Sequence, residues 1–470
     1  MTAKQTLDLL RRYESRNVTF IEPDGTWPIV WKRAKGVHVW DADGHKYLDL
    51  TAAFGVAAAG HANPRVIQSG QRQMAILVHA MGDVHPHALK AQLARELSRV
   101  TFQRWAVNQR EAPQDTPPTG KTIFCNSGFE AVEAALKTAM LATGKRGVIA
   151  FEGGYHGLGY GALNATHREH FRWRFRAQLG GFGYFVPFPV ADSNLGKNSS
   201  HFPPGRGAGS RDSLLPVPLR EGARGGLAQI EAHIRRFFRR EKIGAILVEP
   251  VQVRGGVNVP PEQFLPMLRR LCDEHRALLL LDEIYTGFGR SGKWFACEHS
   301  GVIPDLICLG KALTGGFPLS ACVGRADLMD AAWPLSTGEA IHTSTFLGHP
   351  VGCAMALAQL GEIEARKLSE RSQRLGAFLL NELASLRIPC STLASGRGLG
   401  LLAGLELRNP DGSPATRVAR QIIKAMLQRG FILLPEGEHA NVISFTPPLT
   451  ITERHLTTAI ATLADLLNRK

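Results

Sequence analysis

The chain has 470 residues, of which 44% are hydrophobic and 20% are charged, and its formal net charge is +14. These values are typical of a globular protein with room for two domains. Lysines and arginines are scattered, with local density only at 168–176, 206–224 and 235–242, and no recognisable nucleic-acid module accompanies them. The excess charge therefore indicates a basic surface or entrance for anionic ligands rather than a nucleic-acid partner.

The cysteines and the first residues of the chain indicate the cellular compartment in which the protein is found. The seven cysteines show neither a CxxC pair nor metal-ligand spacing, and several lie in apolar stretches, which predicts buried free thiols and no metal site. Residues 1–16 carry Asp8 and Glu14 and are typical of a short amphipathic helix rather than a cleaved leader. No apolar run is long enough for a membrane helix. We therefore expect a cytoplasmic protein without a membrane partner.

The first 70 residues are expected to form an entry segment. A helix is predicted near residues 6–13, and two short strands at 37–40 and 47–50 are predicted to be joined by the turn at 41–44. The following loop contains Phe54. By itself, this pattern indicates an ordinary hairpin and loop.

A strand is predicted at 121–126, after a polar, proline-bearing stretch at 103–120 that is expected to be a surface insertion. Ser127 then opens a helix that runs to about residue 142, because a serine followed three residues later by Glu130 forms a capping box. A strand that leads directly into a helix N-terminus leaves free backbone N–H groups for an anion. Such caps are common, so this motif alone is a weak signal.

The next predicted strand, 147–152, ends in the run GGYHG at 153–157. Glycines leave room for a flat ligand, and the ring of Tyr155 can stack on it. His156 is either a second donor near the ligand or a structural histidine, and the sequence leaves both open. Residues 190–224 lack periodicity, which predicts a long loop that acts partly as a lid.

Two further strands carry the residues that we expect to react. Four leucines before Asp282 and the run 305–309 are typical of strands buried on both faces, as in a parallel sheet. Asp282 and Lys311 follow these strands, at the edge where open α/β sheets bind ligands. A lysine between hydrophobic strands can be desolvated, which lowers its pKa and makes its amine a nucleophile toward an aldehyde. A strand at 243–251 and a helix at 260–275 are predicted to precede them.

A carboxylate and a lysine on neighbouring strand ends suit the binding of pyridoxal 5'-phosphate (PLP). Lys311 would form the Schiff base with the aldehyde and later carry the α-proton. Asp282 would keep the pyridine nitrogen protonated, so that the ring accepts electrons. The sequence therefore predicts a PLP site.

The pattern D-E-x-x-T-G-F-G-R from Asp282, followed by G-K-x-x-x-x-G around Lys311, resembles the class III (ω-type) aminotransferases, a family of fold type I PLP enzymes. The resemblance covers residue identities and spacing. It implies an α/β fold in which a large domain, with a mostly parallel seven-stranded sheet sandwiched by helices, is joined by a smaller α+β domain. We expect the large PLP-binding domain at 71–345, and the small domain at 346–470 together with the N-terminal segment 1–70.

The resemblance also implies roles for cofactor-binding residues. Ser127 and Gly128 would hold the phosphate, with Phe129 at a position where a polar residue is more usual. Tyr285, which replaces the commoner glutamine, would hydrogen-bond the ring hydroxyl. Thr345 matches a threonine that donates to the phosphate of the neighbouring subunit. The resemblance therefore implies a homodimer or larger assembly with shared active sites.

The substrate contacts are where this sequence departs from the family. In family members, the region of Phe54 touches substrate. Those that use 2-oxoglutarate carry an arginine just before the P-P-L triplet, where it grips a carboxylate and otherwise pairs with the glutamate after the catalytic aspartate. In this sequence Ser444 stands at the position of that arginine, whereas the glutamate is present as Glu283. Glu283 is predicted either to find Arg290, another basic group or water, or to bind a cationic part of the substrate together with Glu436.

These inferences predict a PLP-dependent aminotransferase that moves an amino group from an amine or (ω-)amino acid to a 2-oxo acid in a ping-pong cycle. The alternative is a PLP-dependent amino-acid racemase or epimerase of the same family, because the arginine before P-P-L is missing and a racemase needs no oxo-acid acceptor. The sequence identifies neither the donor nor the acceptor.

Overall fold

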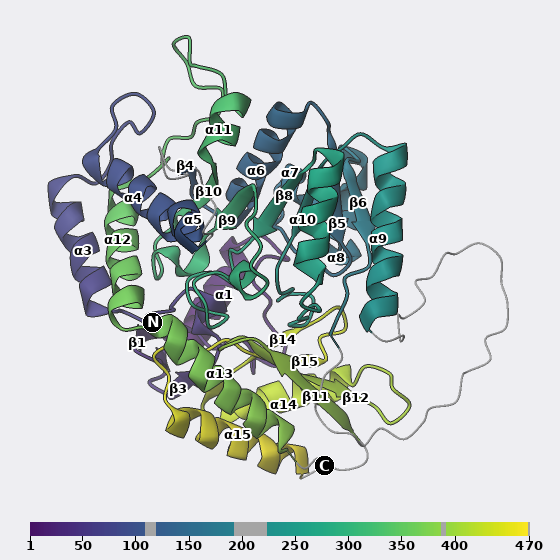
Figure 1. The fold of residues 1–470 in the computed structure, drawn as a ribbon. Coiled ribbons are helices and arrows are strands. Elements are labelled where there is room, and N and C mark those ends of the chain that lie inside the picture. The colour runs from purple at the N-terminus through teal and green to yellow at the C-terminus, as the bar shows by residue number, and fades with distance from the viewer. Residues whose placement is uncertain (109–118, 192–222, 387–391, 469–470) are drawn as a thin grey trace.

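The computed structural model describes residues 1–108, 119–191, 223–386 and 392–468. A seven-stranded sheet forms the centre of the protein (Figure 1). Its strands are β4 (Gly120–Cys125), β5 (Gly147–Phe151), β6 (Gly183–Val186), β7 (Ile243–Val248), β8 (Leu278–Asp282), β9 (Leu306–Leu309) and β10 (Ser320–Arg325). The spatial order is β4-β10-β9-β8-β7-β5-β6, and β10 alone runs antiparallel to its neighbours. The mostly parallel seven-stranded sheet is therefore confirmed.

The leucine run before Asp282 is buried on both faces, as predicted. Leu279 and Leu281 belong to one apolar cluster and Leu280 belongs to another, because successive side chains of a strand point to opposite faces. Helix α6 (Gly128–Thr143) packs on the face of Leu280, while α4 (Ala88–Ser98) and α10 (Phe264–His275) pack on the other.

Further helices surround this sheet or lie below it in Figure 1. They are α1 (Ala3–Tyr13), α2 (Ala52–Gly55), α3 (Pro64–Ile76), α5 (Arg104–Asn108), α7 (Tyr160–Ala165), α8 (Glu169–Arg172), α9 (Ala223–Arg240), α11 (Ala326–Ala332), α12 (Pro350–Ala365), α13 (Leu368–Ala384), α14 (Thr416–Gln428) and α15 (Glu453–Asn468). Within the described ranges, no helix is both long and apolar enough to cross a membrane.

Two smaller sheets complete the fold. One has the order β1-β2-β3-β13 and the other has the order β11-β12-β15-β14. Their strands are β1 (Trp31–Lys35), β2 (His38–Asp41), β3 (Lys46–Asp49), β11 (Leu393–Gly398), β12 (Ala403–Arg408), β13 (Phe431–Ile432), β14 (Leu434–Glu436) and β15 (Val442–Phe445). Because β13 pairs with β3, the first and last parts of the chain share a sheet. The predicted domain boundaries after residues 70 and 345 stay predictions.

Two predicted segments differ from expectation. The start of the stretch 103–120 is the helix α5 rather than a surface insertion. Trp105 is buried against Phe102 and Phe295, and its indole N–H donates to Glu298 at 3.0 Å. Residues 109–118 of that stretch lie outside the described residues, as do residues 192–222 of the predicted lid. The six cysteines in the described part are buried free thiols, as predicted.

Candidate active site

A cavity of about 410 Å³ opens at the carboxyl edge of the seven-stranded sheet. The turns that follow β4, β5, β7, β8 and β9 all contribute to its walls, because the carboxyl ends of parallel strands meet at one edge. The lining residues are Gly128, Phe129, Tyr155, His156, Gly157, Leu158, Glu249, Arg254, Asp282, Ile284, Tyr285 and Lys311.

Lys311 projects into this cavity from the turn after β9. Its φ of 37° lies in the left-handed region, which disfavours a side chain and is maintained here by the surrounding structure. Among the described residues, no group forms a hydrogen bond or ion pair with its Nζ, which lies 4.5 Å from the ring centroid of Tyr285. Burial lowers the pKa of this amine, against the charges of Asp282 and Glu249. The environment therefore favours a neutral, nucleophilic amine.

Asp282 is the last residue of β8 and is held by two contacts. Its Oδ2 lies 2.8 Å from Nδ1 of His156, and its Oδ1 accepts the backbone N–H of Ile284 at 3.1 Å. His156 is itself buried, and its backbone N–H donates to Thr166. This buried side chain fixes the carboxylate of Asp282, which is a structural role, and the role of His156 as a donor near the ligand stays a prediction.

Glu249 also lines the cavity, and sequence reasoning gave it no role. It follows β7, and its carboxylate oxygens accept the backbone N–H groups of Tyr155 at 2.9 Å and Val253 at 3.2 Å. Burial raises the pKa of this carboxyl to about 7. Glu249 therefore ties the turn of Tyr155 to the turn after β7.

The N-terminus of α6 has the features of an anion site. Glu130 accepts the backbone N–H groups of Asn126 and Ser127, at 2.7 and 3.2 Å, which forms half of the predicted capping box. The hydroxyl of Ser127 is buried and has no partner among the described residues. Because first-turn N–H groups of a helix lack intrahelical acceptors, Gly128 and Phe129 add free donors beside this hydroxyl.

Phe129 packs tightly against the turn after β5. A Cβ placed on Gly157 would lie 2.3 Å from the Cβ of Phe129, and the φ of Gly157 is +112°. Glycine is therefore required at position 157. Tyr285 is similarly close to Gly55, and its hydroxyl lies 3.2 Å from Oγ1 of Thr446.

Six predicted residues lie outside the lining, namely Phe54, Ser127, Glu283, Thr345, Glu436 and Ser444. Phe54 is 48% exposed and belongs to the left-handed run 52–55. Ser444 is buried in β15 and pairs with β12 and β14. Thr345 is exposed, and its predicted contact with a partner's phosphate stays a prediction.

Glu283 is not at the cavity. Its carboxylate accepts the hydroxyl of Thr286 at 2.6 Å and the backbone N–H groups of Ala296 and Cys297, at 2.9 and 2.8 Å. Arg290 instead donates to the carbonyl oxygens of Leu401 and Pro447. The expected pairing with Arg290 is therefore wrong. Glu283 is also a poor candidate for a substrate cation, because both its oxygens hold the turn.

Arg254 is the main residue that sequence reasoning missed. It lines the cavity, its guanidinium carbon lies 5.1 Å from the ring centroid of Tyr155, and its Nε lies 3.3 Å from Oε2 of Glu436. Glu436 is 4% exposed, and burial raises the pKa of its carboxyl to about 7. The sequence signal that could have identified Arg254 is a single charge in the otherwise apolar run VQVRGGV after β7.

The family profile of Aminotransferase class-III matches residues 20–467. The chain belongs to this family. It is 35% identical over 441 residues to a 5-aminovalerate aminotransferase of Pseudomonas aeruginosa, with 93% of each chain covered. It is 32% identical to an acetylornithine aminotransferase of Methanosarcina mazei, over 93% of this chain and 92% of that one. The solved amine transaminase of an uncultivated Pseudomonas species, in its PLP-bound form, has a TM-score of 0.80 at 26% identity, over 97% of this chain and 98% of that one.

The protein is therefore a PLP-dependent aminotransferase with the fold type I architecture. These relatives are all aminotransferases, so they do not favour the racemase or epimerase alternative. The residues present fit PLP, because the cavity combines an unpaired lysine with a buried carboxylate held by His156, and the unpartnered hydroxyl of Ser127 lies at the helix N-terminus next to the lining residue Gly128.

Proposed function

We propose that this enzyme moves an amino group from an amine or (ω-)amino acid to a 2-oxo acid, and that both half-reactions use the cavity around Lys311. The observation that carries the proposal is the free amine of Lys311, whose pKa is lowered by burial, in one cavity with the Asp282–His156 pair. This is the arrangement of acid and base groups that amino transfer needs.

PLP, when bound, supplies a ring that accepts electrons from the carbon next to the reacting nitrogen. We assign Asp282 to the ring nitrogen, where its charge would hold a proton, and His156 keeps that carboxylate in place. Tyr155 would cover the face of the ring, and Tyr285 would contact the ring hydroxyl. Ser127, Gly128 and the backbone of Phe129 would hold the phosphate at the N-terminus of α6. The support is the lining of the cavity and the unpartnered hydroxyl of Ser127.

Lys311 carries the proton. Its neutral amine would take the proton from the carbon that bears the donor's amino group and pass it to the carbon that had been the aldehyde of the cofactor. In the second half-reaction it would carry a proton in the opposite direction, from that carbon to the carbonyl carbon of the 2-oxo acid. Because burial disfavours the charged ammonium, return of the proton is favoured.

We also infer a homodimer or larger assembly, in which Thr345 donates to the phosphate of the neighbouring subunit. The exposed apolar side chains around this segment support it, since Leu335, Ile341 and Phe346 are 94, 66 and 54% exposed. The buried free thiols support a cytoplasmic location. Sedimentation analysis should give at least a dimer, and a monomer at micromolar concentration would contradict the shared site.

The test of the reaction is a visible absorption spectrum of the holoenzyme, recorded with single amino donors in the absence of oxo acid. The cofactor band should disappear with a suitable donor and return when one 2-oxo acid is added. A band that persists while an L-amino acid loses its optical activity would contradict amino transfer and restore the racemase alternative.

A further inference from the structure

We propose that Arg254 binds the carboxylate of the 2-oxo acid, and that Glu436 is the resting counter-ion that this carboxylate displaces. The inference rests on the proposed function and names the residue that recognises the acceptor. Ser444 stands at the position where family members that use 2-oxoglutarate carry a carboxylate-binding arginine. Another residue of this chain must therefore bind the carboxylate of the acceptor.

The lining of the cavity leaves Arg254 as the candidate. Apart from Lys311, which the reaction uses, Arg254 is the only lysine or arginine among the residues that line the described cavity. A 2-oxo acid carries its carboxylate one bond away from the reacting carbon, so its anion must be bound within the same cavity as Lys311. Arg254 and Lys311 are close enough that the charge of Arg254 contributes to lowering the pKa of the Lys311 amine.

The guanidinium of Arg254 has donors to spare. Within the described part of the chain, its one polar contact is the ion pair from Nε to Glu436 at 3.3 Å, and this Nε has no well-directed hydrogen bond. A guanidinium has five N–H donors in a planar fork that matches the two oxygens of a carboxylate. The face of Tyr155, 5.1 Å away, supports the planar group without using those donors.

Glu436 suits the role of an exchangeable counter-ion. It ends β14, and its side chain is buried beside the charges of Arg254, Arg168 and Lys311. Burial raises the pKa of its carboxyl to about 7 despite these positive charges. When the carboxylate of an acceptor occupies Arg254, Glu436 can therefore take up a proton instead of remaining a second buried anion.

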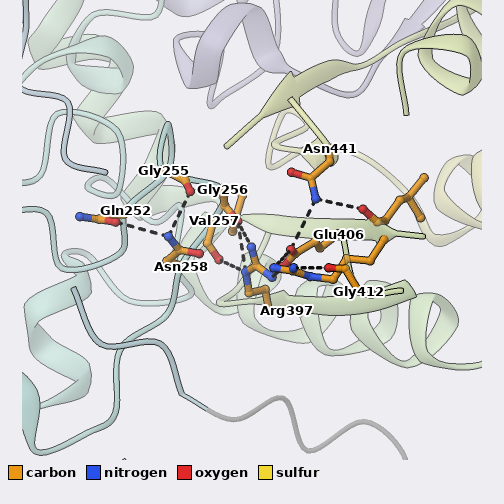
Figure 2. A network of polar contacts seen from close by, with 11 residues as sticks. Gln252, Gly255, Gly256, Val257, Asn258, Arg397, Glu406, Gly412 and Asn441 are labelled. Atoms are coloured by element: carbon orange, nitrogen blue, oxygen red, sulfur yellow. Dashed lines mark hydrogen bonds and ion pairs between the residues drawn. The ribbon is translucent and has the colours of Figure 1, made fainter. Parts of the chain in front are cut away.

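Arg254 is presented by a turn that is fixed before any ligand binds. Figure 2 shows this turn, in which the side chain of Asn258 donates to Gln252 and Gly255, and Arg397 donates to the carbonyl oxygens of Gly256 and Val257. The backbone N–H of Gly437 also donates to the carbonyl oxygen of Arg254 at 3.2 Å. This last bond joins the turn to the residue after Glu436, so that the arginine and its counter-ion are held in register. Pre-organisation of this kind lowers the entropic cost of binding.

The test compares two acceptors that differ in the carboxylate, pyruvate and propanal, at a saturating concentration of one amine donor. Arg254→Gln should raise the KM for pyruvate about 10- to 100-fold, the usual value of a charge-assisted contact, and change the KM for propanal less than about 3-fold. Arg254→Lys should lie between wild type and Arg254→Gln for pyruvate. Equal losses for pyruvate and propanal would overturn the assignment.

Arg168→Gln is the matched control. It removes a neighbouring positive charge that acts on Glu436 but does not line the described cavity. A general loss of electrostatic attraction would raise the KM for pyruvate in both variants alike, which would contradict direct binding by Arg254. Unchanged melting temperature and cofactor absorption of the Arg254 variants exclude a folding defect.

A separate variant tests the role of Glu436 as the counter-ion of Arg254. Glu436→Gln removes the competing carboxylate and should lower the KM for pyruvate several-fold, while an unchanged or raised KM would overturn this half of the proposal.

Calorimetric titration of the holoenzyme with propionate, an unreactive carboxylate, tests Arg254 without turnover. Wild type should bind propionate and Arg254→Gln should not. If both bind alike, the assignment fails, whereas absence of amino transfer in wild type with intact propionate binding would refute only the proposed reaction.

Discussion

The two walls of the cavity are held in different ways. The sheet wall, which we define as Ser127, Tyr155, Asp282 and Lys311, is attached to the carboxyl ends of β4, β5, β8 and β9 in one seven-stranded sheet. The opposite wall, which we define as the lining residue Arg254 together with Glu436, which pairs with it, and Thr446, which contacts Tyr285, depends on side-chain contacts between remote segments. Examples are Arg397 with the turn of Arg254, and Thr446 with the carbonyl oxygen of Thr51 at 3.0 Å.

This difference predicts that substitutions on the sheet wall affect the chemical step, whereas substitutions on the opposite wall affect the selection of the acceptor. A side chain on the sheet wall can be replaced while the hydrogen-bonded strands keep its neighbours in place, so its loss removes a chemical group. A side chain that supports the opposite wall from outside, such as Arg397, holds remote segments together, so its loss is expected to change stability and acceptor preference together. The following predictions test the two halves of this comparison.

The largest effect is expected for Lys311→Ala. Removal of the proton carrier should lower kcat by about 10⁴-fold or more, since general acid–base catalysis and the covalent role are both lost. Stability should be unchanged or higher, because a desolvated amine is removed. Steady-state kinetics and thermal unfolding of the same preparation measure both.

Lys90→Ala is the matched control for this prediction. Lys90 is also half-buried with a pKa lowered by burial, but it donates to the carbonyl oxygen of Gly82 outside the cavity. Its replacement should leave kcat within about 3-fold of wild type, as for an ordinary non-catalytic position. If kcat falls to a similar extent in Lys90→Ala and Lys311→Ala, the fall in Lys311→Ala is not specific to the sheet wall.

Asp282→Asn should have the second largest effect. The amide keeps the shape of the side chain and removes the charge, so kcat should fall about 10²- to 10³-fold, as for other single electrostatic groups. Asp305→Asn is the control, because Asp305 is a buried carboxylate of the same sheet that pairs with Arg269 and Arg325. It should lose stability and keep kcat, and an equal loss of kcat there would contradict a chemical role for Asp282.

The sheet wall is the part that the sequence could predict. Asp282 and Lys311 directly follow apolar runs, and Ser127 joins a strand to a helix, so local patterns place all three at one edge. The resemblance to class III aminotransferases agreed with the cofactor inferred from these residues and added the number of strands. No long-range contact had to be known for these inferences.

The opposite wall could not be read in the same way. Glu283 was predicted to contact Arg290 or the substrate, but it follows Asp282 directly and consecutive side chains point to different sides, so it lies away from the cavity. Its partners Ala296 and Cys297 lie in a later turn. The pairing of Arg254 with Glu436 joins the turn after β7 to β14, and no periodicity links such distant residues.

Arg397→Leu tests the support of the opposite wall. Arg397 donates to the turn of Arg254 and pairs with Glu406 at 2.6 Å, with both side chains 14% exposed. Loss of one partner of a buried pair should cost about 3 kcal/mol of unfolding free energy. The KM for a 2-oxo acid should rise while kcat changes little. Arg408→Leu removes the more exposed partner of Glu406 and should cost less than about 1 kcal/mol. Equal costs, measured by urea unfolding, would contradict the role of Arg397 in holding the turn.

The smallest effect is the pH dependence that Glu436 contributes. Burial raises the pKa of its carboxyl from 4.5 to about 7, so the folded protein holds this proton at pH values where the unfolded chain has lost it. Stability is therefore complete below the unfolded pKa and declines as the pH rises toward 7. Between about pH 5 and pH 8, wild type should lose about 2 kcal/mol relative to Glu436→Gln, which cannot ionise. Urea unfolding of both proteins at the two pH values measures this difference. A constant difference would show that Glu436 is already ionised at pH 5, paired with Arg254, and would make the opposite wall a fixed ion pair instead of an exchangeable one.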